Sequence, residues 1–164
     1  MQYDPNKEQQ LIVIDKSEVR AVWHLVEPAL IALRTEQEAP DKWIVPDVYN
    51  SITSGGATLA FTTLAPAPDR TAAINSASGF VVLQKVNGYA GSALHIWIAA
   101  RTDKDSTGKA EASIMRTFSD DLDALARHYH CNAITFGSNR AFWDKVAPRF
   151  GFEVLETRWS RPVV

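Results

Sequence analysis

Short apolar runs separated by polar or glycine-containing turns recur along the whole chain, and they predict β-strands. The runs are LIVID (11–15), ATLAFTTL (57–64), GFVVLQKV (79–86), ALHIWIAA (93–100), AITFGS (133–138) and FEVLETRWS (152–160). Asn87-Gly88, directly after the third run, predicts a hairpin to the fourth, because both residues accept positive φ at low cost. The last run alternates with a period of two, which is typical of a strand. We therefore predict about six strands.

Apolar residues three and four positions apart predict helices between these strands. The first stripe consists of Val22, Leu25, Val26, Ala29, Leu30 and Leu33. Ser17 is predicted to cap this helix. Pro28 is predicted to kink or divide it, because proline removes a backbone donor. A short second helix is predicted from near Pro46 to the Gly55-Gly56 pair.

The second half of the chain predicts two more helices. A long one follows Gly108, and its apolar face carries Met115, Phe118, Leu122, Leu125 and Tyr129. The segment NRAFWDKVAPRF (139–150) is predicted as a helix that bends or ends near Pro148. The stretch APAPDRTAAINSAS (65–78) is predicted as a loop. The resulting order, β-α-α-β-β-β-α-β-α-β, places the chain in the α/β (α+β) class.

Length and charge narrow the class of protein. The 164 residues predict one domain over 1–164. The formal net charge of −2 lacks the basic excess of a nucleic-acid surface, and no apolar run approaches the roughly 18 residues that span a bilayer. Cys131 is the single cysteine, which fits a reducing compartment. Because the start MQYDPNKEQQ does not match a signal peptide, we expect a cytoplasmic protein that binds neither nucleic acid nor membrane.

The segment RTDKDSTGKAEAS (101–113) joins a predicted strand to a predicted helix, where many proteins hold a phosphate. It is not a nucleoside-triphosphate loop, because Asp103 stands where that motif needs a glycine and Ala110 where it needs Ser or Thr. A single glycine is also too few for a dinucleotide fingerprint.

The start of the following helix is still suited to an anion. Its first N–H groups have no partner within the helix, and the helix dipole favours negative charge there. Gly108 lets a ligand approach the backbone because it has no Cβ. The nearby charges are Arg101, Lys104 and Lys109, opposed by Asp103 and Asp105. The alternative is a solvated turn capped by Ser106 or Thr107.

The order of elements, and the position of this loop after the fourth strand, resemble the GNAT superfamily of N-acetyltransferases. That family's loop, Gln/Arg-x-x-Gly-x-Gly/Ala, holds the pyrophosphate of acetyl-CoA with backbone amides. Here the frame falls on residues 105–110, and the half Gly108-x-Ala110 matches. The segment SNRAFWDKVAPRFGFEVLE (138–156) is similar to the family's Asn…aromatic…Gly-Phe ending, with Gly151-Phe152 at the last strand. LHIWIAA and RAFW look most like divergent members encoded by bacteriophages.

The resemblance implies a mixed, mostly antiparallel central sheet of about six strands flanked by helices. It implies acetyl-CoA as co-substrate, no metal, and an amine of a small molecule or protein as acceptor. The residues it places at the cofactor are Ala99, Arg101, Ser106, Thr107, Gly108, Lys109, Ala110 and Asn139, the last beside the pantetheine arm. Trp23 and Trp43 fall in the segment that shapes the family's acceptor pocket, and their alternative role is packing.

Acetyl transfer needs a deprotonated amine held near the thioester carbon and a donor for the carbonyl oxygen. The resemblance assigns much of this to the backbone of LHIWIAA. Alternation predicts one face with His95, Trp97 and Ala99, and the other with Leu94, Ile96 and Ile98. His95 is the candidate catalytic base, because its ordinary pKa is near neutrality. The alternative is a hydrogen-bonded strand histidine beneath a helix.

Two positions depart from the family and support a second hypothesis. Asp105 replaces Gln or Arg at the start of the loop. Ala147 stands where the family often has the tyrosine that protonates the departing thiolate, so Tyr129, Tyr49 or a water would have to replace it. The second hypothesis is a catalytically inactive protein on the same fold, a phage virion or host-interaction component with a protein partner.

Two other chemistries receive little support. His128, His130 and Cys131 are too crowded at one helix end to make a zinc site, and they are predicted to interact with the last helical carbonyls. A Gly-x-Ser-x-Gly nucleophile elbow is absent from the sequence, so a hydrolase triad lacks its usual anchor.

Overall fold

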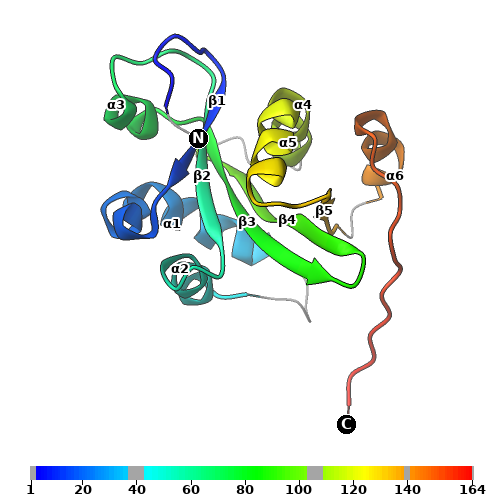
Figure 1. Cartoon of the computed structure of the whole chain (residues 1–164). Coiled ribbons are helices and arrows are strands. Elements are labelled where there is room, and N and C mark those ends of the chain that lie inside the picture. Colours follow the sequence, from blue (N-terminus) through cyan, green and yellow to red (C-terminus); the bar gives the residue numbers. More distant parts are fainter. Residues whose placement is uncertain (1–2, 37–42, 103–108, 139–140, 164) are drawn as a thin grey trace.

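The computed structural model describes residues 3–36, 43–102, 109–138 and 141–163 (Figure 1). The strands are β1 (Gln10–Ile14), β2 (Thr58–Thr63), β3 (Gly79–Gly88), β4 (Gly91–Arg101) and β5 (Ala133–Phe136). The helices are α1 (Val19–Glu36), α2 (Val45–Thr53), α3 (Arg70–Asn75), α4 (Lys109–Thr117), α5 (Ser119–His128) and α6 (Trp143–Val146). Two 3₁₀ turns are η1 (Lys16–Glu18) and η2 (Ala147–Phe150).

The strands form one sheet in the order β1-β2-β3-β4-β5. Neighbours from β1 to β4 are antiparallel, and β5 pairs parallel with β4. This arrangement confirms the predicted mixed, mostly antiparallel sheet flanked by helices. The described residues contain five strands, against about six predicted, and the difference lies at the C-terminus.

Helices cover both faces of the sheet, with α1, α2 and α3 on one side and α4 and α5 on the other (Figure 1). The first core lies under α1–α3, and its strand residues are Ile12, Ile14, Leu59, Phe61, Phe80, Val82, Ile98 and Ala100. The second core lies under α4–α6, and its strand residues are Leu11, Ala60, Val81, Leu83, Leu94, Ile96 and Ala99. Strands buried on both faces need apolar residues at every position, which explains the continuous apolar runs.

The start of α1 differs from its prediction in one detail. The carboxylate of Asp15, not the hydroxyl of Ser17, caps the first turn, and it accepts hydrogen bonds from the N–H and Oγ of Ser17 at 2.9 and 2.6 Å. Pro28 lies inside one continuous helix, so of the two predicted alternatives, a kink or a division, the division into two helices is wrong. Pro28 is exposed, and the carbonyl that loses its helical donor can therefore be solvated.

A short helix, α3, replaces the loop predicted over residues 65–78. The side chain of Asp69 caps it by accepting from the N–H of Ala72 at 2.8 Å. Arg70 then joins α3 to the rest of the fold, donating to the carboxylate of Glu18 at 2.6 and 3.1 Å and to the carbonyl of Val13 at 3.1 Å. The Asp69 cap and the guanidinium of Arg70 therefore stabilise α3, which is too short to show a helical hydrophobic period in the sequence.

Three further expectations need adjustment. The helix predicted after Gly108 is divided at Phe118 into α4 and α5. The predicted hairpin is confirmed, but its turn is Tyr89-Ala90, because Asn87 and Gly88 pair with residues of β4. The predicted last strand is wrong: residues 153–163 form no regular structure and are exposed, and Figure 1 shows this segment running away from the body.

None of the described helices is long and apolar enough to cross a membrane.

Position 79, at the start of β3, has room for glycine only, because the backbone of β4 lies close to it. A Cβ at this position would overlap the carbonyl oxygen of Ala100 on β4. We predict that Gly79→Ala lowers the free energy of unfolding by about 1–3 kcal/mol, the usual cost of overpacking, as measured by urea denaturation. Gly137→Ala is the matched control, because its Cβ would meet nothing within 4 Å, and we expect a change within about 0.5 kcal/mol. Equal effects would contradict the proposed overlap.

Candidate active site

One extra residue in β4 changes the direction of its side chains. Val82 of β3 lies opposite Ile98, but the next residue, Leu83, lies opposite Ile96. Trp97 therefore has no partner on β3 and forms a β-bulge. Bulges of this kind bend a strand and commonly re-aim side chains next to active sites.

The bulge corrects the predicted faces of β4. Ile98 packs in the first core with Trp97 beside it, and Ala99 packs in the second core. The prediction that Ala99 shares a face with His95 and Trp97 is therefore wrong. His95 lies between Leu94 and Ile96, which both belong to the second core, so alternation turns His95 toward the α1–α2 side of the sheet.

The bulge also coincides with the end of the pairing between β4 and β5. The parallel register joins 93–96 to 133–136, with Ile96 opposite Phe136. β4 continues to Arg101, and no described strand accompanies residues 97–101 along that edge. Backbone donors and acceptors on this edge are placed to bind an extended ligand, in the way that a strand edge binds another strand.

His95 is held beside this point by β5. Its Nδ1 lies 2.9 Å from Oγ1 of Thr135, the residue opposite it in the register. In the tautomer in which Nδ1–H donates to Thr135, Nε2 carries the lone pair that can accept a proton. Partial burial lowers the pKa of His95 below its ordinary value, because desolvation disfavours the imidazolium. The side chain is therefore neutral at pH 7, as a general base must be.

The C-terminal end of β4 is hydrogen-bonded to the loop that precedes β3. Thr102 donates from its N–H to the carbonyl of Ser78 at 3.1 Å and from its hydroxyl to the carbonyl of Ala77 at 2.6 Å. Ala99 is buried and Arg101 is half-buried. These contacts hold the strand end from which the loop to α4 departs.

The remaining predicted cofactor residues are described only in part. Ser106, Thr107, Gly108 and Asn139 lie outside the described residues. Lys109 and Ala110 form the first positions of α4, whose helical geometry leaves the first N–H groups without partners inside the helix. α4 therefore begins shortly after the C-terminal end of β4, the part of the strand that has no described neighbour on the β5 side.

Trp143 of α6 adds a buried donor that the sequence analysis did not assign to the site. It is 5% exposed, and its indole Nε1 has no hydrogen-bond partner among the described residues. Its ring packs 4.6 Å from that of Phe136, the last residue of β5. A buried N–H without an acceptor is costly, so Trp143 is a candidate donor whose acceptor is not among the described residues.

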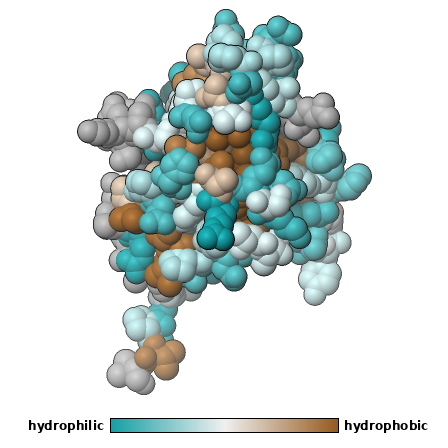
Figure 2. All heavy atoms as spheres, turned by 90° about the vertical axis from the view of Figure 1, so that its left-hand side faces the viewer, coloured by the Kyte–Doolittle hydropathy of each residue, from teal (hydrophilic) through white to brown (hydrophobic). Residues whose placement is uncertain are grey.

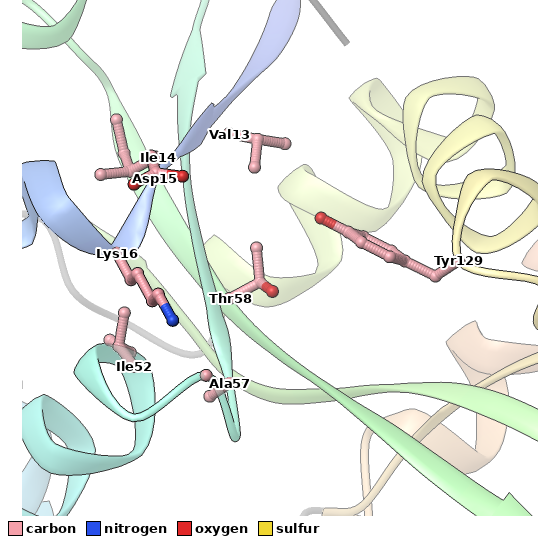
Figure 3. Close-up of a pocket in the computed structure, with 9 residues that line it drawn as sticks. Val13, Ile14, Asp15, Lys16, Ile52, Ala57, Thr58 and Tyr129 are labelled. Atoms are coloured by element: carbon pink, nitrogen blue, oxygen red, sulfur yellow. The ribbon is translucent and has the colours of Figure 1, made fainter.

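The tyrosines suggested as replacements for the missing acid lie in different places. Tyr129, at the end of α5, points toward Val13 and Thr58 on the β1–β2 side (Figure 3), and it packs on the second core, on the face opposite to His95. Tyr49 lies on the same side of the sheet as His95, with its ring 4.9 Å from that of Trp23. Ala147 is packed against the second core and supplies no acid.

Tyr129 lines a separate hollow of about 240 Å³ at the end of β1, with Val13, Lys16, Ile52 and Thr58 around it. Figure 2 shows this side of the molecule, on which apolar atoms are exposed near the middle among polar ones. The hollow is smaller than most ligand sites and borders the edge of the sheet opposite to β5. We therefore do not assign it to the cofactor.

Trp23 and Trp43, which the resemblance places near an acceptor pocket, both pack on the first core. Trp43 is buried in the first core, and Trp23 donates from Nε1 to the carboxylate of Glu27 at 2.9 Å. Among the residues that the structure describes, no group of His, Cys, Asp and Glu side chains is arranged to hold a metal.

No protein-family model and no curated protein matches this sequence, but solved structures do match. An aminoglycoside acetyltransferase from an uncultured soil metagenomic sample, in complex with sisomicin, aligns over 98% of this chain and 100% of its own, with a TM-score of 0.60 and 6% identity. A GNAT family acetyltransferase from Staphylococcus aureus aligns over 96% and 100%, with a TM-score of 0.56 and 11% identity.

A ribosomal-protein-alanine N-acetyltransferase from Brucella melitensis biovar Abortus aligns over 95% of this chain and 98% of its own, with a TM-score of 0.52 and 14% identity. Coverage is almost complete in both directions for all three structures. At these identities the likeness establishes architecture: the chain has the fold of the GNAT acetyltransferases.

The lowered pKa of His95 predicts a pH dependence of stability. The unfolded chain, with a His pKa of 6.5, takes up this proton before the folded protein does as the pH falls. The free energy of unfolding therefore decreases as the pH falls through 6.5 toward the folded-state pKa, and this contribution is constant below it. We predict that His95→Asn flattens the curve in this window, as measured by urea unfolding at a series of pH values. Parallel curves for the two proteins would contradict the burial argument.

Proposed function

We propose that this protein is an N-acetyltransferase of the GNAT superfamily that transfers the acetyl group of acetyl-CoA to an amine. The observation that carries the proposal is the open edge of β4 beyond Ile96, beside the bulge at Trp97, in a chain with the GNAT fold. Placement in the cytoplasm and in the bacteriophage-type subgroup belongs to the same proposal and rests on the sequence.

The residues around this edge suit acetyl-CoA. The pantetheine arm carries amide groups that can pair with the backbone of residues 97–100, which no described strand accompanies on that edge. The indole N–H of Trp143 offers one more donor near the end of β5. The start of α4 favours the pyrophosphate through its N–H groups and dipole. Ala99, Arg101, Ser106, Thr107, Gly108, Lys109, Ala110 and Asn139 remain the proposed cofactor-binding residues.

His95 supplies the proposed base. The amine attacks the thioester carbon, the new C–N bond forms, the C–S bond breaks, and Nε2 of His95 takes the proton that the amine releases. Thr135 fixes the ring by its contact with Nδ1, which leaves Nε2 for this transfer. Because Ala147 provides no phenol, we propose that the departing thiolate takes its proton from water.

The acceptor is proposed by class. Two structural neighbours are an aminoglycoside acetyltransferase and a ribosomal-protein-alanine N-acetyltransferase, so we propose a substrate panel that contains both small polyamines and peptide N-termini. His95 and Trp97 lie on the α1–α2 side of β4, and we propose that the acceptor approaches from this side.

A second candidate function rests on Ala147 and Asp105. Ala147 offers a methyl group where the family often has an acid, and a carboxylate at Asp105 would repel a pyrophosphate. These two residues favour a binding protein on the same fold that has lost turnover, with a phage or host protein as its partner. It predicts a stable partner and no release of free thiol.

The test of the proposed function combines calorimetry with acetyl-CoA and detection of free thiol over the amine panel. We expect binding, turnover with at least one amine class, and a fall in kcat of about 10²–10⁴-fold in His95→Asn, the usual contribution of a general base. His24→Asn, an exposed histidine of α1, is the matched control and should retain activity. Binding without turnover would favour the second candidate, and the absence of both would exclude the enzyme.

Trp143→Phe tests the buried donor separately. Phenylalanine keeps most of the packing and removes the N–H, which has no partner among the described residues. We therefore expect the free energy of unfolding of the unliganded protein to change by less than about 1 kcal/mol. We also expect acetyl-CoA affinity to fall about tenfold, which corresponds to one lost hydrogen bond. A large loss of stability with unchanged affinity would show that the N–H serves the fold.

A further inference from the structure

The hollow at the end of β1 is lined by four separate parts of the chain (Figure 3). They are the end of β1 with the η1 turn, the end of α2 with the turn after it, the start of β2, and Tyr129 at the end of α5. Its volume of about 240 Å³ is many times the roughly 10–15 Å³ that one water molecule needs. The hollow can therefore hold a small organic molecule.

The apolar part of this hollow is held in place by both cores. Ile14, Ile52 and Ala57 are buried members of the first core, and Val13 packs on the second. Side chains fixed by packing on both faces of the sheet form a wall that exists before a ligand arrives. Such a wall favours the apolar body of a ligand, because its burial removes apolar surface from water.

Three hydrogen-bond donors face the same space. The hydroxyl end of Tyr129 and the amino end of Lys16 point into it from opposite sides of Thr58, as Figure 3 shows. Among the residues that the structure describes, the hydroxyls of Tyr129 and Thr58 and the ammonium of Lys16 have no hydrogen-bond or ion-pair partner. Tyr129 is itself fixed, since its N–H donates to the carbonyl of Leu125 at 2.9 Å. Two hydroxyls and one cation are therefore available to an acceptor that a ligand supplies.

The charges around the hollow determine which anion fits it. Lys16 is positive and Asp15 beside it is negative, so the lining side chains carry no net charge. Oδ1 of Asp15 accepts from the N–H and Oγ of Ser17 at 2.9 and 2.6 Å, which keeps this carboxylate in the η1 turn. A ligand with one negative charge can pair with Lys16, whereas a second negative charge would be repelled by Asp15. A monocarboxylate therefore suits the hollow better than a phosphate dianion.

We propose that this hollow is a binding site for a small monocarboxylic acid with a short apolar chain. The carboxylate accepts hydrogen bonds from Lys16, Thr58 and Tyr129, and its two oxygens have enough lone pairs for all three donors. The apolar chain of the acid lies against the apolar wall. β1 and β5 are the two ends of the sheet, so this site is distinct from the edge proposed for acetyl-CoA. The proposal does not depend on acetyl transfer.

Calorimetry on the full chain tests the site, with 4-methylpentanoate as the probe. We expect saturable binding with a dissociation constant on the order of 1 mM or below, as a ligand of this size allows. The Tm should rise with probe concentration, because the acid binds the folded chain. Two comparison compounds, 4-methylpentan-1-ol without the charge and inorganic phosphate without the apolar chain, should bind at least about tenfold more weakly. No binding of the acid, or equal binding of either comparison compound, would overturn the proposal.

Substitutions identify the residues that hold the acid. Lys16→Gln removes the cation of an exposed side chain, and Tyr129→Phe removes only a hydroxyl. Each should weaken the binding of 4-methylpentanoate by about tenfold, the value of one lost hydrogen bond, and leave the Tm of the unliganded protein unchanged. Lys145→Gln changes an exposed lysine of α6, beside the other edge of the sheet (Figure 1), and as the matched control it should bind normally.

Amide NMR shifts during the same titration locate the acid directly. We expect the largest shifts at Gly55 and Thr58, which line the hollow. Equal losses of affinity in Lys16→Gln and Lys145→Gln would show that the acid responds only to overall charge, and shifts confined to β5 and α6 would place it at the other edge. Either result would overturn the proposal.

Discussion

The pairing of β3 with β4 positions every other part of the proposed site. It is the longest ladder of the sheet and runs from Gly79 opposite Arg101 to Gly88 opposite Gly91. Its register is interrupted once, at the bulge formed by Trp97. With Trp97 inserted, β4 serves two environments: its first half pairs with β5, and its second half leaves β5 and lies under α4. The placement of His95 and Ala99 on opposite faces follows from that one insertion, and the insertion coincides with the point at which the pairing with β5 ends.

Two cores on opposite faces of the sheet support this arrangement in different ways. The first core packs α1–α3 against β1, β2, β3 and the second half of β4, and it contains the largest fully buried rings, Phe61 and Phe80. The second core packs α4–α6 against β3 and β4 and reaches the open edge through Phe136 and Trp143. The proposed chemistry therefore lies at the sheet edge between the two cores, with Phe136 and Trp143 on the second-core side and His95 and Trp97 on the α1–α2 side.

The sequence predicted most of the sheet because strands buried on both faces leave unmistakable apolar runs. It did not reveal the bulge, since an extra apolar residue within such a run changes no pattern, and Ala99 was consequently assigned to the wrong face. Residues 152–160 were predicted as a strand from their alternation. Alternation describes the two faces of a strand and says nothing about whether a neighbouring strand is present to pair with it. The start of α3 could have been predicted from Asp69, a residue type that commonly caps helices. The helix has too few apolar residues to show a helical hydrophobic period. His95 was predicted correctly as a residue of β4. Trp143 is distinguished only by its Nε1, which has no hydrogen-bond partner among the described residues.

The hairpin turn at Tyr89-Ala90 also bears on the order in which the molecule folds. β3 and β4 are joined by two residues, so their pairing closes a very small loop, whereas β1 must meet β2 across α1 and α2. Loop closure is the main entropic barrier to early contacts, and hairpins form in about 1–10 μs. We infer that the β3–β4 hairpin nucleates the sheet, and pulse-labelled hydrogen exchange should find its amides protected first. The element that shapes the site would then also be the element from which the fold begins.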